Sequence, residues 1–456
     1  MSMGKLFGTS GVRGIVNEFL TPELALKVGM ATASVSKAKK ALVATDTRVT
    51  GPLIEKALVA GLEACGVNTC KIGVVATPVL AYLTRALGTD VGFMITASHN
   101  PPQYNGIKIF GGDSLSYTDD LQDAVEKRIF ESSFDLADWR TIGETTVSDE
   151  SRRYLDMARK AAKTKKKWRV VVDPGCGATY DVAPTVFKEV GCEVIALNAN
   201  PDGFFPARSS EPTEESLSGT SKVVEAMDAD MGVGFDGDGD RVAFIDDKGS
   251  FVDFDRALAA FSSYVVRKNP GGTVVTTVEA SMCVERMVEA AGGKVVRTKV
   301  GDVYVSETIK CVGGVFGGEP CGAWVHPVYH YCPDGPLSAV LFLNALEDTG
   351  KSMSEFVGEV PQFLTLREKV KCENDLKKPF LALMEKNIKK AFSGFKDFST
   401  VDGVRIAVEE GWLLIRPSGT EPVIRVTVEG ESLKAARDIM ERGKAVIHDA
   451  LETVRK

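Results

Sequence analysis

The sequence predicts an α/β protein: three similar domains of mixed strands and helices, followed by a smaller α+β domain. A succession of apolar strands and helices occurs three times, and each time the third strand runs into a loop of unusual composition. The C-terminal portion instead has consecutive strands followed by one long helix, which is typical of α+β domains. The length, 456 residues, suggests about three domains on the usual relation between length and domain number.

The composition is that of an ordinary soluble protein, with 44% apolar and 26% charged residues. The net charge of -7 argues against nucleic acid as the main partner, so an anionic substrate needs local clusters of Arg and Lys. No stretch has the length and apolar character of a membrane span, and the first residues lack the apolar core of a signal peptide. Nine cysteines without a C-x-x-C pair indicate a reducing compartment. We therefore expect a cytoplasmic protein that binds neither nucleic acid nor membrane.

The chain opens with a glycine-rich loop, G-T-S-G-V-R-G, at residues 8–14. Thr21 and Pro22 are typical of the cap and first position of a helix, which ends in a lysine-rich stretch near Lys37. The first unit then alternates strand, helix, strand, helix and strand, at residues 41–45, 54–64, 67–75, 80–87 and 91–95.

The same order of elements recurs twice. The second unit has strands at 169–173, 193–197 and 230–235 and a helix at 183–190; the third has strands at 273–277, 294–298 and 313–317 and a helix at 284–291. In every unit glycine stands between the helix and the second strand: Gly66, Gly191 and Gly292-Gly293. We interpret this as a threefold internal repeat, although any α/β protein can yield some coincidences of this kind.

Domain boundaries are expected where the pattern restarts, giving domains at 1–150, 151–252, 253–365 and 366–456. In the last portion, strands at 404–408 and 412–415 are joined by Glu-Glu-Gly as in a hairpin, and a third strand occupies 423–429. Ser432 then caps a long terminal helix.

A serine loop, T-A-S-H-N-P at 96–101, follows the last strand of the first unit. Two prolines prevent a simple continuation into helix or sheet, so Ser98 is presented on a stiff loop at a strand end, where open α/β sheets keep their chemistry. An N-G turn is predicted at 105–106, after which Lys108 lies on the opposite face of a short strand from two isoleucines. The loop therefore gathers a hydroxyl, the His99 imidazole and an ammonium, unless it is a plain surface turn.

The second unit ends in D-G-D-G-D-R, which places Asp236, Asp238 and Asp240 at alternate positions. Glycine lets the backbone fold tightly enough for the three carboxylates to converge, and they repel one another unless a cation lies among them. Such oxygen ligands favour a hard ion, Mg²⁺ first where phosphate is handled. The loop does not fit an EF-hand, whose sixth position is Gly and here is Arg241. An acidic surface turn is the alternative.

A run near the C-terminus, R-P-S-G-T-E-P-V-I-R, combines cations and hydroxyls around a tight turn: Arg416, Ser418, Gly419, Thr420 and Arg425. Two guanidinium groups, two hydroxyls and the exposed N–H groups of the turn suit a phosphate dianion better than they suit a plain hairpin. The opening loop, with Ser10 and Arg13, is a weaker candidate of the same kind.

Two cysteines and two histidines lie close in the sequence: Cys321, His326, His330 and Cys332. These are zinc-type ligands, but Pro327 interrupts a helical H-x-x-x-H face and the spacing matches no usual zinc finger. Zinc is therefore the less favoured interpretation.

Four loops occur along the chain in a fixed order: the serine loop, the acidic loop, a G-E-x-x-G loop at 318–322 and the terminal R-P-S-G-T-E-P loop. In these motifs and their order, essentially the whole chain resembles the α-D-phosphohexomutases. The resemblance implies three related α/β domains and a fourth similar to the TATA-binding-protein fold, arranged around a central cleft. It also implies an isomerase that interconverts hexose 6-phosphates and hexose 1-phosphates.

By the same resemblance, Ser98 carries a phosphoryl group, and one of its oxygens completes the Mg²⁺ shell of the three aspartates. This group passes to a hexose phosphate, and the resulting hexose 1,6-bisphosphate turns in the cleft before its other phosphate returns to the serine. Lys108 and Arg241 supply positive charge. The terminal loop grips the non-reacting phosphate, and Glu319 accepts hydrogen bonds from the sugar.

Two departures from the family pattern concern the G-E-x-x-G loop. Many relatives have G-E-x-S-G-H, whereas here Cys321 stands for a serine that touches the sugar and Ala323 for a histidine proposed to transfer a proton. Three side chains are candidates for that proton transfer: Lys108, His99 and His326.

Two stretches resemble the phosphoglucosamine branch of the family, particularly its archaeal members: the opening loop and K-V-G-D at 299–302. The second stretch adds Asp302 to the expected substrate-binding residues. Glucosamine 6-phosphate is the expected substrate, and phosphomannomutase or phosphoglucomutase activity is the nearest alternative. A metal-dependent sugar-phosphate phosphatase and a non-catalytic sensor are more distant. The expected assembly is a monomer or homodimer.

Overall fold

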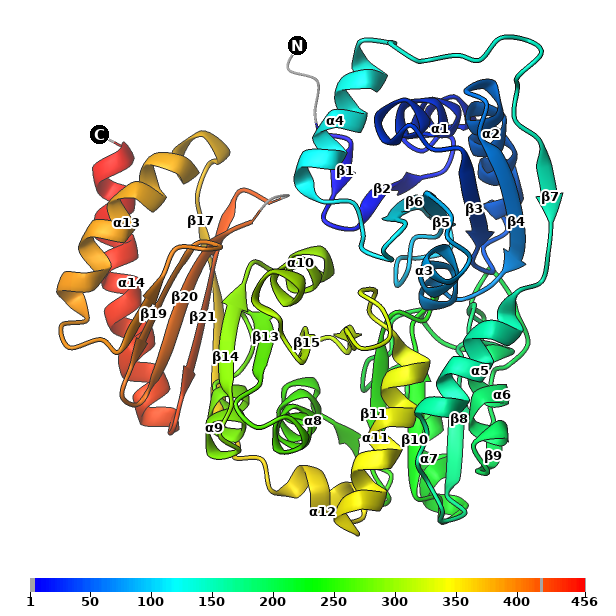
Figure 1. The fold of residues 1–456 in the computed structure, drawn as a ribbon. Coiled ribbons are helices and arrows are strands. Elements are labelled where there is room, and N and C mark those ends of the chain that lie inside the picture. The colour runs from blue at the N-terminus through cyan, green and yellow to red at the C-terminus, as the bar shows by residue number, and fades with distance from the viewer. Residues whose placement is uncertain (1–4, 419–420, 456) are drawn as a thin grey trace.

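The computed structural model describes residues 5–418 and 421–455, which form four sheets with flanking helices (Figure 1). The first domain consists of β1 (Phe7–Gly8), β2 (Gly11–Ile15), α1 (Pro22–Ser36), β3 (Lys40–Thr45), α2 (Gly51–Ala64), β4 (Asn68–Val74), α3 (Thr77–Ala86), β5 (Val91–Ile95), β6 (Tyr104–Gly111), α4 (Asp119–Phe130) and β7 (Thr145–Val147). Thr21 accepts a hydrogen bond from Leu24 N at the start of α1, and Lys37 ends this helix in the left-handed region, so the predicted helix is confirmed.

The second and third domains follow the same plan with fewer strands. The second contains α5 (Ser151–Ala161), β8 (Arg169–Asp173), α6 (Val182–Glu189), β9 (Glu193–Ala196), α7 (Ser218–Ala226), β10 (Met231–Phe235), β11 (Val242–Ile245) and β12 (Phe251–Val252). The third contains α8 (Phe254–Lys268), β13 (Thr273–Thr277), α9 (Cys283–Ala290), β14 (Lys294–Thr298), α10 (Asp302–Val312), β15 (Phe316–Gly318), β16 (Trp324–Val325), α11 (Gly335–Thr349) and α12 (Met353–Gly358).

The first three sheets share one arrangement of strands, which confirms the threefold repeat. Their common strand orders are β4-β3-β5-β6, β9-β8-β10-β11 and β14-β13-β15-β16. In each of these orders the second strand pairs in parallel with both of its neighbours, and the third pairs antiparallel with the fourth. The carboxyl ends of the parallel strands therefore meet at one edge, where ligand sites of such sheets lie.

The fourth domain is the predicted α+β unit. It contains β17 (Leu364–Lys371), a short 3-10 helix (Asn374–Leu376), α13 (Lys377–Ala391), β18 (Asp397–Ser399), β19 (Val404–Val408), β20 (Gly411–Pro417), β21 (Val423–Gly430) and α14 (Leu433–Arg455). The sheet order is β17-β21-β20-β19-β18, and α13 and α14 cover one face of it (Figure 1). Ser432 Oγ accepts a hydrogen bond from Ala435 N at 3.1 Å, as expected of the cap of the terminal helix.

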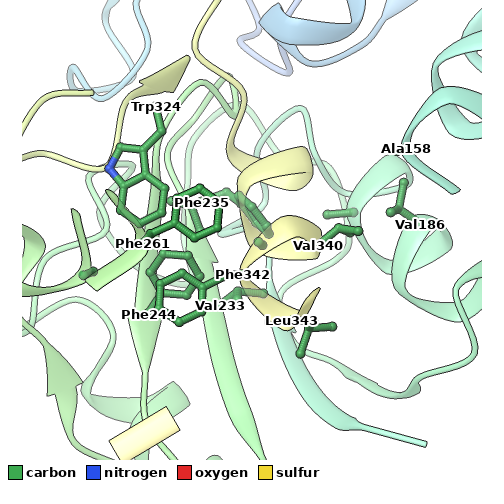
Figure 2. Close-up of a cluster of buried hydrophobic side chains, with 14 of the residues drawn as sticks. Ala158, Val186, Val233, Phe235, Phe244, Phe261, Trp324, Val340, Phe342 and Leu343 are labelled. Carbon is green, nitrogen blue, oxygen red and sulfur yellow. The ribbon is translucent and has the colours of Figure 1, made fainter. Parts of the chain in front are cut away.

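One hydrophobic core contains residues of the first three domains, the first domain has a further core of its own, and the fourth domain has a separate one. The helix α11 follows the third sheet in the sequence but packs against α5, α6 and two strands of the second domain. In Figure 2 its side chains Val340 and Phe342 lie between Val186 of the second domain and the rings of Phe261 and Trp324. The fourth domain adds to this body only a small apolar contact at Val278, Trp412 and Leu414.

Two local predictions were wrong. Residues 105–106 form no turn but lie within β6, because Gly106 is needed for close packing: a Cβ there would lie 2.6 Å from Thr96 O and 2.7 Å from Val12 O. The strand expected at 313–317 begins only at Phe316, since Gly313 has a φ of 66° and ends α10.

Candidate active site

The serine loop leaves the carboxyl end of β5 and is held by one buried arginine. Ser98 is buried and has a φ of 50°, a left-handed conformation that is strained for a residue other than glycine. Arg48 donates hydrogen bonds to backbone carbonyl oxygens of the loop: those of Ser98 (2.8 Å), Asn100 (2.6 Å), Pro101 (2.7 Å) and Tyr104 (2.9 Å). Its own charge is balanced by Asp46, 3.0 Å away. Arg48 was not among the predicted site residues, because it lies 50 residues before the Ser98 carbonyl that it holds.

The acidic loop follows β10 and faces the serine loop. Ser98 Oγ donates a hydrogen bond to Asp236 Oδ2 at 2.6 Å. Lys108 Nζ lies 2.7 Å from Asp238 Oδ2 and also contacts Asp240 Oδ2, so β6 supplies one ammonium to two carboxylates. The predicted side of β6 for this lysine is therefore confirmed.

The three aspartates fit a hard divalent cation. One ligand atom from each lies within 4.8 Å of those of the others, and no other His, Cys, Asp and Glu group of this kind occurs in residues 5–418 and 421–455. Oδ1 of Asp238 and Oδ1 of Asp240 are buried, and neither has a hydrogen-bond partner in that part of the chain. Burial, and then the charges of the other two aspartates, raises the pKa of Asp236 well above its ordinary value. The loop thus holds more negative charge than Lys108 neutralises.

All four domains line one cavity of about 480 Å³, which we call the central cavity. The predicted residues that line it are Ser10, Arg13, Ser98 and Lys108 of the first domain, Asp240 and Arg241 of the second, Asp302, Glu319 and Cys321 of the third, and Arg416 and Arg425 of the fourth. Asp236 and Asp238 are fully buried behind this wall. Ser418 is buried and accepts a hydrogen bond from Glu421 N, while Gly419 and Thr420 lie outside the described residues.

Two titratable groups at the site, one in the serine loop and one on β6, are held in opposite forms. His99 Nδ1 lies 3.2 Å from Ser98 Oγ. Burial, with Arg241 and Arg13 nearby, lowers the pKa of His99 to about 3, so its imidazole is neutral at pH 7. Burial acts against the charge of Lys108, but Asp238 and Asp240 outweigh it and raise the pKa of Lys108, so this group stays an ammonium.

The third domain contributes a polar wall. Ser10 Oγ donates to Asp302 Oδ1 at 3.0 Å, across the gap between the first and third domains. Glu319 Oε2 accepts from Gly301 N at 2.8 Å, and burial followed by the charge of Asp302 raises the pKa of Glu319 to about 7. Burial raises the pKa of Cys321 to about 12, so a thiol rather than a thiolate faces the cavity.

Two acidic residues of the cavity wall were missed by sequence analysis. Glu279 Oε1 accepts a hydrogen bond from Arg416 Nη1 at 2.7 Å, and Glu211 lies 3.5 Å from Arg241 Nη1. Glu279 could have been found, because it stands two residues after β13 at the same sheet edge as the other loops. Glu211 lies in a long loop without any recognisable pattern.

The histidines of the predicted Cys and His cluster lie elsewhere. His326 Nε2 is 2.8 Å from Ser338 Oγ, and burial lowers the pKa of His326 to about 3. His330 Nε2 is 2.8 Å from Asp334 Oδ2. Neither is among the residues lining the central cavity, whereas Cys321 is, so the cluster does not assemble.

Comparison with known proteins decides the family. Four models described as phosphoglucomutase/phosphomannomutase match in order: alpha/beta/alpha domain I at residues 4–136, domain II at 152–249, domain III at 253–363 and the C-terminal domain at 368–444. A probable phosphoglucosamine mutase of Methanopyrus kandleri is 43% identical, with 100% of both chains covered. This chain belongs to the phosphoglucomutase/phosphomannomutase family. A probable phosphoglucosamine mutase of Pyrococcus furiosus is also similar, at 42% identity over 99% of both chains.

Solved structures of the phosphoglucomutase/phosphomannomutase family have the same fold. A family protein from Burkholderia thailandensis gives a TM-score of 0.86 at 28% identity, with 97% of both chains covered. An N-acetylphosphoglucosamine mutase of Aspergillus fumigatus, solved with GlcNAc-6P and magnesium, gives 0.65 at 15% identity over 98% of this chain and 96% of that one, which supports the fold alone. The resemblance, the fold class and the prediction of a mutase are thereby confirmed. No helix in the described part of the chain is long and apolar enough to cross a membrane.

Proposed function

We propose that this protein interconverts hexose 6-phosphates and hexose 1-phosphates through a phosphoserine at Ser98, with glucosamine 6-phosphate as the preferred substrate. The observation that carries this proposal is the 2.6 Å hydrogen bond from Ser98 Oγ to Asp236, at the floor of a cavity lined by all four domains. A phosphoryl carrier, a cation site and two arginines for a remote phosphate thus face one space.

The carboxylates of Asp236, Asp238 and Asp240 would hold Mg²⁺, since their free oxygens are hard donors and their charge is only partly neutralised. When bound, this ion neutralises charge on the phosphoryl group that is transferred. Lys108 is kept charged by two of the same aspartates and adds a second fixed cation beside Ser98.

In the first transfer, the bond between Ser98 Oγ and phosphorus breaks while a sugar hydroxyl oxygen forms a new bond to phosphorus. The proton of that hydroxyl must leave. We propose neutral His99 as the group that accepts this proton, and the imidazolium so formed returns the same proton to the sugar oxygen in the reverse transfer, whereas Lys108 keeps its proton and contributes charge only. Return of the other phosphate to Ser98 regenerates the phosphoserine, so a hexose 1,6-bisphosphate is the intermediate and a trace of it should activate the enzyme.

The arginines of the fourth domain would bind the phosphate that does not react. Arg416 and Arg425 are register partners on the neighbouring strands β20 and β21, and both line the central cavity. Two adjacent guanidinium groups can hold one phosphate dianion, whichever of the two phosphates occupies the place. We propose that Ser418, Gly419 and Thr420 complete this loop.

Glucosamine is favoured over neutral hexoses by charge. Asp302, Glu319 and Glu211 all line the cavity, so a protonated sugar amine would meet carboxylates. The relatives from Methanopyrus kandleri and Pyrococcus furiosus are both named probable phosphoglucosamine mutases, which supports the same choice. We further propose a cytoplasmic monomer or homodimer, in agreement with nine free cysteines.

A coupled assay with Mg²⁺ and a trace of the matching bisphosphate tests the proposal on glucosamine, mannose and glucose phosphates. Glucosamine phosphate should be converted fastest, and S98A should lose the activity. Release of inorganic phosphate without isomerisation would support a phosphatase, in which water accepts the phosphoryl group. Equal activity of S98A and the parent would exclude the phosphoserine route.

A further inference from the structure

A second cavity lies between the third and fourth domains, and Trp412 is one of its lining residues. This interdomain cavity has a volume of about 620 Å³, a size typical of small-molecule sites. Its walls are α9 and β14 of the third domain and β18, β19 and β20 of the fourth. It shares none of its lining residues with the central cavity.

The wall of this cavity contains a buried arginine with few partners. Arg405, on β19, is only 4% exposed. Its guanidinium lies over the Trp412 ring, with Cζ 5.0 Å from the centroid, and its Nη1 is 3.5 Å from Asp397 Oδ2. Its Nε is buried and has no hydrogen-bond partner within residues 5–418 and 421–455. This arrangement is costly, because the Nε donor has lost water without gaining a partner.

The other cations of the cavity are already paired, Arg286 with Glu431 among them, whereas the carboxylate of Glu289 has no ion-pair partner within residues 5–418 and 421–455. Arg297 donates to Glu285 Oε2 at 2.7 Å and to two backbone carbonyls, and Glu409 pairs with Lys396. The carboxylate of Asp397 is 64% exposed, so water competes for it. Burial, followed by repulsion from Arg297, lowers the pKa of Arg405 to about 9. The neighbouring carboxylates therefore do not fully neutralise the charge of the Arg405 guanidinium.

We propose that the interdomain cavity binds a small oxyanion, such as the phosphate group of a metabolite, with Arg405 as its principal ligand. A guanidinium offers two parallel N–H groups that match two oxygens of such an anion. The anion would supply the missing hydrogen bonds and charge. Because Arg405 belongs to the fourth domain and the opposite wall to the third, an occupant would also hold these two domains together. The proposal does not depend on the mutase activity.

Thermal unfolding at constant ionic strength, with inorganic phosphate replacing chloride, tests this site. Phosphate can also bind to the central cavity, so the test uses Arg425→Met as its background. In R425M, phosphate should still raise the Tm saturably, by about 2 °C or more. The double variant R405M/R425M should lose this rise, since Met keeps the packing over Trp412 but has no donors.

Arg442 provides the matched control. It is another arginine of the fourth domain placed over an aromatic ring, that of Phe392, but it lies outside the interdomain cavity. R442M/R425M should therefore respond to phosphate as R425M does. The proposal is overturned if phosphate stabilises R425M no more than chloride does, or if R405M/R425M keeps the full rise.

Hydrogen exchange keeps the test decisive if R405M fails to fold. Amides of residues 397–408 in R425M should exchange several-fold more slowly with saturating phosphate than with chloride. Equal exchange in the two salts would refute the site.

Discussion

Replacing Arg48 by Met should damage both stability and catalysis, because this buried side chain holds the serine loop and also balances Asp46. The variant leaves four loop carbonyls without their donor and one carboxylate without its cation. Removing one partner of a buried ion pair costs about 3–5 kcal/mol. Displacement of Ser98 by about 1 Å would lower kcat by about 100-fold.

The pH dependence of this loss has a defined sign. Burial already raises the pKa of Asp46 to about 6, even though Arg48 opposes the shift. A carboxyl group whose pKa is raised by folding binds its proton more tightly in the folded state, so its contribution to stability is lost as the pH rises through the folded pKa. Without Arg48 the pKa of Asp46 rises further. R48M should therefore be less destabilised at pH 6 than at pH 8.

The double variant D46N/R48M separates the two effects. It removes the uncompensated charge, so much of the lost Tm should return, but the loop carbonyls still lack their donor and kcat should stay low. The measurements are thermal unfolding at pH 6 and pH 8 and the coupled mutase assay. Parent-like stability of R48M at pH 8, or recovery of kcat in the double variant, would refute the reasoning.

Three further predictions concern the central cavity. K108M should lower kcat by about 100-fold or more. Because two carboxylates lose their ammonium partner, Mg²⁺ should raise the Tm of K108M more than that of the parent, and a smaller rise would contradict this. Since the pKa of Glu319 is raised to about 7, the contribution of this group to stability is lost as the pH rises through 7. E319Q should therefore show a smaller fall in Tm around pH 7 than the parent, and an unchanged dependence of Tm on pH would contradict this prediction. Iodoacetamide at pH 8 should modify exposed Cys311 well before Cys321, whose pKa is about 12; equal rates by mass spectrometry would be the contrary result.

The positions of Ser98 and the three aspartates are predictable because each loop is a local run of residues directly after an apolar strand. Parallel strands then bring these loops to one edge without further information. The threefold repeat is predictable for the same reason, since helix and strand periods and the joint glycines are local signals.

Other features depend on contacts that no local pattern encodes. Arg48 is separated by 50 or more residues from the carbonyls that it holds. Gly106 looks like part of a turn, but its small size serves two neighbouring strands instead. Likewise, nothing in the sequence near Glu279 indicates that Arg416, from a different domain, will meet it. The cavity wall was therefore only partly predictable.

Because α11 packs into the second domain, recombination between related genes cannot exchange the second or third domain alone without disturbing buried contacts. Because the first three domains share one core, a crossover between the second and third would join halves whose buried side chains had never been selected together. The fourth domain carries its own core and only a small apolar contact with the rest. Residues 364–455 can therefore be exchanged as one unit, and such an exchange would alter the part of the central cavity wall that Arg416 and Arg425 form while leaving the loop of Ser98 unchanged.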